Sequence, residues 1–527
     1  MLDYLIKNAV VLDGTGKDRY AADIGIAGEH IKTIGHLEDV KAEEVIDATN
    51  MFVMPGIIDA VNHSDTHWTI LEEPSQESLL RQGITTIIGG NCGSSLAPSI
   101  EIAALESIRK WADISQANIN WKTLGEFLDE LERHPLGVNF CTLVGHGTLK
   151  RNVFEDMSRK PTEEDVEKMN LLLNNALNEG AFGISFGLAF SQNVPAHQYE
   201  INTLVSVVEK NNGVAAFHMR DEGKNLLASI GEVIDITRTI GVSTEISHLK
   251  AIGRSAWERF PNALEILRSA KKEGLDINAN VFPYERTGSL LFTLLPEWAK
   301  KGEREKILAS FRNPQEREKI LDGIRDLTLH FDRFTIASTL RKSGLIGKTL
   351  EEAAAILNMT PEETMVELLL INELTITIFG QTLQESNIET LLKEPFIHIS
   401  SDGIGKSGDS SWYSLKENLI HPRSFGTVPR VLGRYVREKK IISWEKAIEK
   451  MTGAVADKFH IKKRGKIMKG YSADLVIFDP DKIIDKATYE NPYQYPYGIE
   501  RVFINGVTVV QKGIYRGALE GKVLRRS

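Results

Sequence analysis

The chain has 527 residues, of which 42% are hydrophobic and 26% are charged, so it can bury a large core and is too long for one ordinary domain. Its formal charge of −9 argues against a nucleic-acid-binding protein, which would carry a basic face. Its only two cysteines, Cys92 and Cys141, exclude a disulfide framework.

The first residues, "MLDYLIKNAVVLDGTG", lack the basic and then apolar segments of a signal peptide, so we expect none. No run of about 18 apolar residues occurs, so we expect no membrane span. We therefore predict a cytoplasmic protein, in a reducing compartment that keeps Cys92 available as a thiolate ligand.

Both ends of the chain alternate apolar and polar residues, which is typical of half-buried strands. Examples are "YLIKNAVVLDG" and "ADIGIAGEHIKTIG" near the start, and "ADLVIFDP" and "GIERVFINGVTVVQKG" near the end. We predict that residues 1–54 and 451–527 pair into one small β-sandwich domain.

Between the two ends, eight short apolar strands alternate with amphipathic helical patterns, which predicts an α/β fold with a (β/α)8 TIM barrel over residues 55–450. The stretch from Tyr284 to Pro395 is too long for one crossover, so we predict an inserted subdomain over about residues 286–345. The predicted strands are 55–63, 85–91, 139–145, 181–188, 214–220, 243–249, 277–284 and 395–401.

Most of these strands end in a side chain that can bind a metal or move a proton, and barrel active sites lie at the C-terminal strand ends. One thiolate and two imidazoles, from Cys92, His218 and His248, suit Zn²⁺ with an open position for water, and His63 could add a fourth contact. Each of them alone could equally be a core or surface residue, but their joint placement favours a metal site. In chain order the endings are His63, Cys92, His146, Ser185, His218, His248, Tyr284 and Asp402.

Asp402 and three cations complete the set of candidate residues. Asp402 could cap a helix, a common role of aspartate, or act as the general acid and base beside a metal. Arg220 and Lys250 each follow a predicted ligand by two residues, and strand alternation would place them on the ligand's side. Each cation, including Arg423 in the last loop, could form a surface ion pair. Clustered over a metal, the cations would bind a substrate carboxylate.

The chain resembles the D-aminoacylase (N-acyl-D-amino-acid deacylase) family of metal-dependent amidohydrolases over nearly its whole length. The resemblance implies a barrel, a β-sandwich made by both termini, and an insertion that caps the site. It implies zinc on Cys92, His218 and His248, with Asp402 as acid and base. The segments that carry it are "PGIIDAVNHSD", "QGITTIIGGNCGSSLAP", "GHGTLKRNV", "HMRDEG", "EISHLKAIG", "NANVFPY", "SSDG", "HPRSFGTVPRVLGRYVRE" and "ADLVIFDP".

The resemblance also suggests that Lys250, Tyr284 and Arg423 bind the substrate carboxylate, and we add Arg220 and Ser289 to the predicted substrate-binding residues. The superfamily's His-x-His motif would fall on Val61 and His63. Because valine is not a ligand, we expect one tight zinc site, and a second site is in doubt.

We therefore expect zinc-dependent hydrolysis of N-acyl-D-amino acids to a carboxylate and a free D-amino acid. A cyclic-amide hydrolase of the hydantoinase or dihydroorotase kind is the alternative; many of these bridge two metals with a modified lysine on strand 4, and "GISFGLAF" has none. A non-catalytic amidohydrolase-like protein is a third possibility, but it would be expected to lose Asp402 or the ligands. The expected partner is a small N-acyl amino acid, with no nucleic acid or membrane, and the sequence predicts no oligomeric state.

Overall fold

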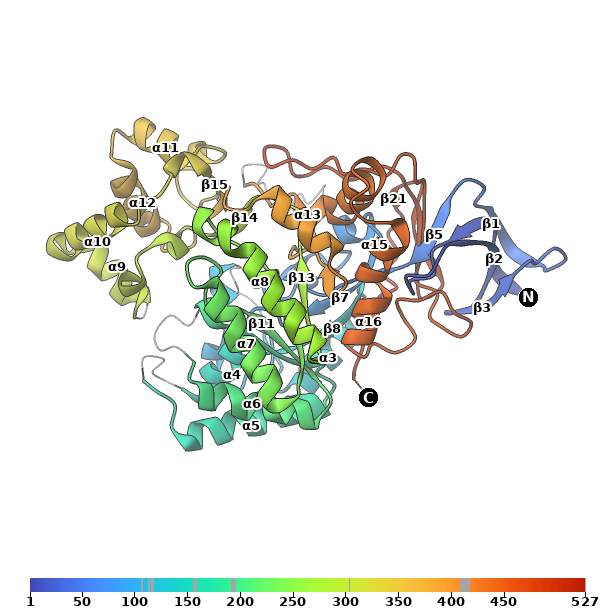
Figure 1. Cartoon of the computed structure of the whole chain (residues 1–527), viewed down its shortest axis with the longest axis horizontal. Coiled ribbons are helices and arrows are strands. Elements are labelled where there is room, and N and C mark those ends of the chain that lie inside the picture. Colours follow the sequence, from blue (N-terminus) through green and yellow to red (C-terminus); the bar gives the residue numbers. More distant parts are fainter. Residues whose placement is uncertain are drawn as a thin grey trace.

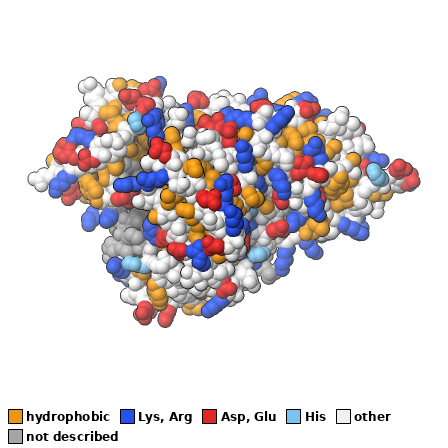
Figure 2. Space-filling model, viewed as in Figure 1, with side chains coloured by type: hydrophobic (Ala, Val, Ile, Leu, Met, Phe, Trp, Pro, Cys, Tyr) orange, Lys and Arg blue, Asp and Glu red, His pale blue; other side chains and the backbone are white. Residues whose placement is uncertain are grey.

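A computed structural model describes residues 1–526 except 106–107, 112–113, 115–117, 155–158, 191–195, 303 and 408–417. Three regions lie in a row: a helical insertion at one end, a barrel in the centre, and a β domain at the other end (Figure 1). On the face shown in Figure 2, basic and acidic side chains are interspersed over all three regions. Among the described helices, none combines the length and apolarity that a bilayer span requires.

The centre is a ring of eight parallel strands. They pair in chain order in two sheets, β6–β7–β8 and β9–β10–β11–β12–β13–β17, with β9 continuing β8. Backbone hydrogen bonds from Asp402 to Val61 (3.0 Å) and from His63 to Gly403 (2.9 Å) close the ring between β17 and β6. The strands are β6 (Ile57–Asp59), β7 (Ile84–Gly89), β8 (Asn139–Thr142), β9 (Val144–Gly145), β10 (Gly183–Gly187), β11 (Val214–His218), β12 (Ser243–Ile246), β13 (Ile277–Val281) and β17 (Ile397–Ile399).

The predicted (β/α)8 barrel is thus confirmed. Strands such as β7 and β11 are buried along their whole length, because the core lies on one face and helices cover the other. The helix predicted over 161–180 is α5 (Glu163–Asn178), which begins at a capping box between Thr162 and Asp165. The other barrel helices are α1 (Thr69–Glu72), α2 (Glu77–Leu80), α3 (Leu124–Arg133), α4 (His146–Val153), α6 (Gln198–Lys210), α7 (Leu226–Ile240), α8 (Arg254–Lys272), α13 (Glu385–Lys393), α14 (Arg423–Arg430), α15 (Trp444–Met451) and α16 (Gly453–Lys458).

The two ends of the chain form one nine-stranded sheet, which confirms the predicted β domain. Its N-terminal and C-terminal parts join where β5 (Phe52–Pro55) pairs antiparallel with β18 (Leu475–Phe478). The sheet encloses a core supplied by both parts, with Ile24 and Phe503 fully buried in it. The remaining strands are β1 (Leu2–Val11), β2 (Tyr20–Ala27), β3 (His30–Gly35), β4 (Ala42–Asp47), β19 (Ile499–Ile504), β20 (Val507–Gln511) and β21 (Ile514–Tyr515).

The insertion between β13 and β17 has a core of its own, with buried residues from Leu290 to Ile378. We predicted it over about 286–345, but this core extends further along the chain because α11, α12 and β16 complete it. The domain boundaries at 54 and 450 stay predictions. The elements are β14 (Thr287–Leu290), α9 (Arg304–Arg312), α10 (Pro314–Asp326), β15 (Phe334–Ser338), α11 (Leu350–Leu357), α12 (Pro361–Ile371) and β16 (Thr377–Gly380).

Candidate active site

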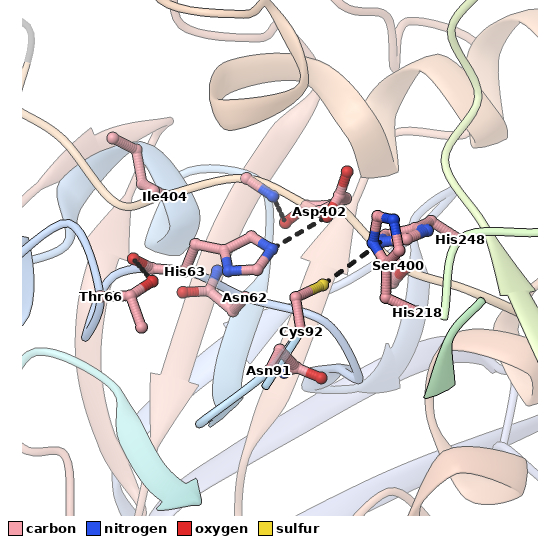
Figure 3. A network of polar contacts seen from close by, with 12 residues as sticks. Asn62, His63, Thr66, Asn91, Cys92, His218, His248, Ser400, Asp402 and Ile404 are labelled. Atoms are coloured by element: carbon pink, nitrogen blue, oxygen red, sulfur yellow. Dashed lines mark hydrogen bonds and ion pairs between the residues drawn. The ribbon is translucent and has the colours of Figure 1, made fainter. Parts of the chain in front are cut away.

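Cys92, His218 and His248 meet at the C-terminal end of the barrel (Figure 3). One ligand atom of each lies within 4.8 Å of the others. Cys92 Sγ is 3.3 Å from His248 Nε2, and that nitrogen is 2.9 Å from His218 Nδ1. The structure therefore brings together the three residues that the sequence predicts as zinc ligands, with both imidazoles buried.

The loop that carries Cys92 is fixed from two sides. Cys92 has a φ of 52°, and Gly90 and Gly93 beside it have φ of 68° and 80°, so the chain turns through the left-handed region. The Ser185 hydroxyl on β10 accepts a hydrogen bond from Gly93 N (2.9 Å) and donates one to Gly90 O (2.5 Å). From the other side, Gly147 N of α4 donates to Gly93 O (2.9 Å). These contacts hold the thiol toward the histidines.

His248 is anchored from below by a buried polar network. Asn280 Oδ1 accepts a hydrogen bond from His248 N (2.6 Å), and Asn280 Nδ2 donates to Glu245 Oε1 (2.9 Å). His398 Nδ1 lies 3.1 Å from the same carboxylate oxygen. Because β12 ends at Ile246, this network, and not the strand ladder, orients His248.

Glu222 is a functional candidate that the sequence reasoning missed. Its Oε1 lies 3.2 Å from His248 Nδ1, and its Oε2 lies 2.9 Å from Lys250 Nζ and 3.9 Å from His218 Nε2. Burial alone would raise the pKa of Glu222, but Lys250 and the two imidazoles lower that pKa to about 2. A carboxylate behind metal-binding histidines fixes their orientation. The sequence signal that could have found it is a carboxylate four residues after His218, in "HMRDEG".

Asp402 faces the three ligand residues from the last strand. His63 Nε2 lies 3.0 Å from its Oδ1, and Arg423 Nη1 lies 2.5 Å from its Oδ2. Burial alone would raise the pKa of Asp402, but Arg423, His248 and His63 hold that pKa well below its usual range. Figure 3 shows Cys92 between the His63–Asp402 pair and the two histidines. Residues 402–407 form no helix, so the alternative that Asp402 caps one is wrong.

Arg220 does not join the cations near the ligands. Its Nε and Nη2 donate to both carboxylate oxygens of Glu232 on α7, at 3.1 and 2.8 Å. We expected strand alternation to place Arg220 beside His218, but β11 ends at His218 and alternation does not continue past a strand. Its predicted substrate contact would require this ion pair to open.

The hydrogen bonds of Tyr284 and Ser289 join them to residues other than the three predicted ligands. Tyr284 is buried, and its hydroxyl donates to Pro422 O at 3.3 Å. Ser289 lies on β14 of the insertion, where its hydroxyl accepts from Thr293 at 3.4 Å. Tyr284 thus contacts the residue that precedes Arg423, whereas Ser289 contacts a residue of the insertion.

His421 is a second residue that the sequence reasoning missed. Its Nδ1 accepts a hydrogen bond from Arg423 N (3.2 Å), and its Nε2 donates to Arg286 O (2.9 Å). Burial and the neighbouring Arg423 keep the pKa of His421 well below its usual range, so the ring is neutral. Aromatic rings from the barrel, the insertion and the C-terminal region surround it with centroids 5.2 to 6.2 Å away: Phe282, Tyr284, Phe379 and Tyr489.

Two other residues singled out in the sequence lie outside the cluster. His146 Nε2 is 2.7 Å from Glu200 Oε1, and Lys150 Nζ is 3.4 Å from the same oxygen, in a buried group between α4 and α6. Cys141 is fully buried within β8, and burial raises the pKa of its thiol. The contacts of His146 and the burial of Cys141 account for both residues without a metal.

Known proteins are similar to this chain over most or all of its length. The model of the "Amidohydrolase family" matches residues 44–510. A D-aminoacylase from Alcaligenes xylosoxydans xylosoxydans is 30% identical over 529 residues, covering 100% of this chain and 98% of the relative.

Two solved structures are similar over the full length of both chains. One is an N-acyl-D-glutamate deacylase from Bordetella bronchiseptica complexed with zinc and a phosphonate inhibitor that mimics the tetrahedral intermediate (TM-score 0.83, 27% identity). The other is a D-aminoacylase with a binuclear metal centre, described as showing one-metal activation and second-metal attenuation (TM-score 0.82, 29% identity). The chain therefore belongs to the amidohydrolase family and, within it, to the D-aminoacylase group.

Proposed function

We propose that this chain hydrolyses the amide bond of N-acyl-D-amino acids and releases a carboxylate and a free D-amino acid. The observation that carries the proposal is the convergence of Cys92, His218 and His248 opposite a buried, ionised Asp402. The relatives support the substrate class, because two of those reported above, with matches of about 30% identity, are a D-aminoacylase and an N-acyl-D-glutamate deacylase.

The donor set fits zinc. One thiolate and two imidazoles within reach of one point are a typical three-residue zinc site, and Glu222 supplies the carboxylate that such histidines need behind them. A zinc ion held there would polarise the amide carbonyl and lower the pKa of an attacking water. We propose one tight site, because the buried Val61 supplies no ligand and His63 is already paired with Asp402.

Asp402 is the proposed acid and base. It would accept a proton from the water as the water attacks and then deliver that proton to the departing amine. The contacts of His63 and Arg423 hold its two oxygens in place for both transfers. Hydrogen bonds to an ionised carboxylate are strong enough to fix this geometry.

Arg423 and Lys250 are the proposed contacts of the substrate's α-carboxylate. Each is at present paired with a carboxylate of the site, Asp402 and Glu222 respectively, so both are held at the edge of the cluster. The planar guanidinium of Arg423 can bind a carboxylate through two parallel hydrogen bonds. Tyr284 would help by holding the backbone before Arg423, through Pro422.

A substrate screen tests the proposal. Purified, zinc-loaded protein should hydrolyse N-acetyl-D-amino acids faster than their L enantiomers, and should leave hydantoin and dihydroorotate intact. The Asp402→Asn variant is the negative control for contaminating hydrolases. Preferred hydrolysis of a cyclic amide would contradict the proposal. Strand β10 argues against a cyclic-amide hydrolase, because it has no lysine to bridge two metals and its Ser185 instead holds the Cys92 loop.

We further propose that the protein works in the cytoplasm on small substrates. A reducing compartment keeps Cys92 free to bind zinc as a thiolate. Detection of activity in the soluble fraction after gentle lysis, with extracellular and membrane fractions inactive, would test this location.

A further inference from the structure

Glu222 contacts two parts of the site that have different tasks. On one side its Oε1 lies 3.2 Å from Nδ1 of His248, a proposed zinc ligand. On the other side its Oε2 lies 2.9 Å from Nζ of Lys250, a proposed contact of the substrate carboxylate. One side chain therefore lies between the metal ligands and the substrate-binding cation.

The chain is built to keep Glu222 in this place. The backbone N–H of Ile252 donates to Glu222 O (2.8 Å), which ties the loop after β12 to the loop after β11. Glu222 is 7% exposed, so water cannot replace a lost partner. A buried carboxylate needs cationic or hydrogen-bonding partners, and the described side chains around it supply Lys250 and the two imidazoles.

The contact with His248 is poised to strengthen. Glu222 Oε1 and His248 Nδ1 are both buried and close, yet they are not aligned as a hydrogen bond. When Lys250 turns toward an anionic ligand, Glu222 loses part of its neutralising charge. Its carboxylate can then align with His248 Nδ1, 3.2 Å away, and a closer contact there holds the ring with its other nitrogen toward Cys92 and His218.

We propose that Glu222 is a positioning residue that serves both zinc binding and recognition of the substrate carboxylate, and that it couples the two. The identity of the carboxylate ligand rests on the proposed function; the effect on zinc does not. Coupling between two binding events is reciprocal, so a carboxylate ligand should tighten zinc binding by the same factor by which zinc tightens the ligand.

The first test measures zinc alone. Competition with a chromophoric chelator should show zinc affinity about 10- to 100-fold weaker in Glu222→Gln than in the parent, the usual effect of losing a carboxylate behind a histidine ligand. Glu222→Asp should recover part of the loss. The control is Glu232→Gln, which removes a carboxylate paired with Arg220 near the same strand end and should keep the parent's affinity.

A spectroscopic signal separates positioning from general damage. In the Co²⁺-loaded protein, the thiolate and imidazole ligands give absorption bands that report the geometry around the metal. These bands should shift in Glu222→Gln and should stay unchanged in Glu232→Gln, which keeps the pair of Glu222 and Lys250. Unchanged zinc affinity and unchanged bands in Glu222→Gln would overturn the proposal, whatever the substrate proves to be.

The second test measures the coupling. In the Asp402→Asn background, which should turn over substrate about 10²- to 10⁴-fold more slowly, saturating N-acetyl-D-methionine should tighten zinc binding by roughly 5-fold or more. This gain should disappear in Glu222→Gln and in Lys250→Met, and Lys250→Met without ligand should bind zinc at least as tightly as the ligand-free background, because Glu222 has then already lost its cation. A gain that survives in Glu222→Gln would mean that the ligand acts on the metal directly, and it would overturn the coupling.

Discussion

The site has two halves that the fold supports in different ways. The ligand half comprises Cys92, His218 and His248, which lie at or just after the ends of strands β7, β11 and β12 and are held by neighbouring strand ends. The loop half comprises Asp402 and Arg423, which both follow the last strand. Its supports come from three regions: the barrel, the insertion and the C-terminal segment around Tyr489.

This difference separates metal binding from selectivity. The ligand half depends on the barrel alone, so changes in the insertion or in the loop after Asp402 leave it intact. The loop half takes its position from the regions that differ most easily in length, since loops and insertions tolerate change better than strands do. Substrate preference in such a barrel can therefore change while the metal site stays the same.

The largest expected effect comes from removing the thiolate of the ligand half. Cys92→Ala should lose tightly bound zinc and at least about 10³-fold in activity, because a metal contributes several kcal/mol to such reactions. Elemental analysis should find about one zinc per chain in the parent. Cys141→Ala is the matched control and should keep metal and activity, because Cys141 is buried within β8. Two tightly bound ions in the parent would contradict the single site.

Asp402→Asn tests whether the two halves are separable. It should retain zinc and fold but lose about 10²- to 10⁴-fold in kcat, the usual effect of removing an acid–base group. Metal content and kcat must be measured on the same preparation. If zinc is lost together with activity, Asp402 belongs to the ligand half and the comparison fails.

Arg423→Ala tests selectivity in the loop half. Loss of a buried, charge-assisted contact costs about 2 kcal/mol or more, so kcat/KM should fall about 30-fold or more. The variant should also lose the parent's preference for an acylated amino acid over the same compound with its carboxylate blocked. Arg220→Ala is the control, and it should change kcat/KM less than about 5-fold, since its partly exposed ion pair contributes about 1 kcal/mol at most.

The smallest expected effect concerns the hydroxyl that fixes the Cys92 loop. Ser185→Ala removes two hydrogen bonds and should weaken zinc binding about 10-fold, with little change in kcat once zinc is saturating. The control is Ser243→Ala, which changes a serine at the N-terminal end of β12, the end away from His248. It should leave zinc affinity unchanged. A fall in kcat at full zinc occupancy would show that the ligand half also shapes the loop half.

Sequence patterns predicted the barrel and the pairing of the two ends because apolar runs and turn residues are local signals. They also placed Cys92, His218 and His248 at one rim, since all parallel strands end on the same side. They could not give the partners of side chains beyond a strand end. Arg220 pairs with Glu232 on α7, and Glu222 pairs with Lys250. The sequence predicted neither contact, because such contacts depend on how separate loops pack.

The pairing of β5 with β18 sets an order of events during synthesis. Residues 56–474 lie between these strands, and a ribosome that adds about 5 to 20 residues per second needs on the order of 20 to 80 s to make them. Until then the N-terminal strands lack about a third of their core, including Leu475, Ile477 and Phe503. The strands that precede the barrel thus leave the ribosome before it but are completed after it, and during that delay their apolar residues are open to chaperones or to aggregation.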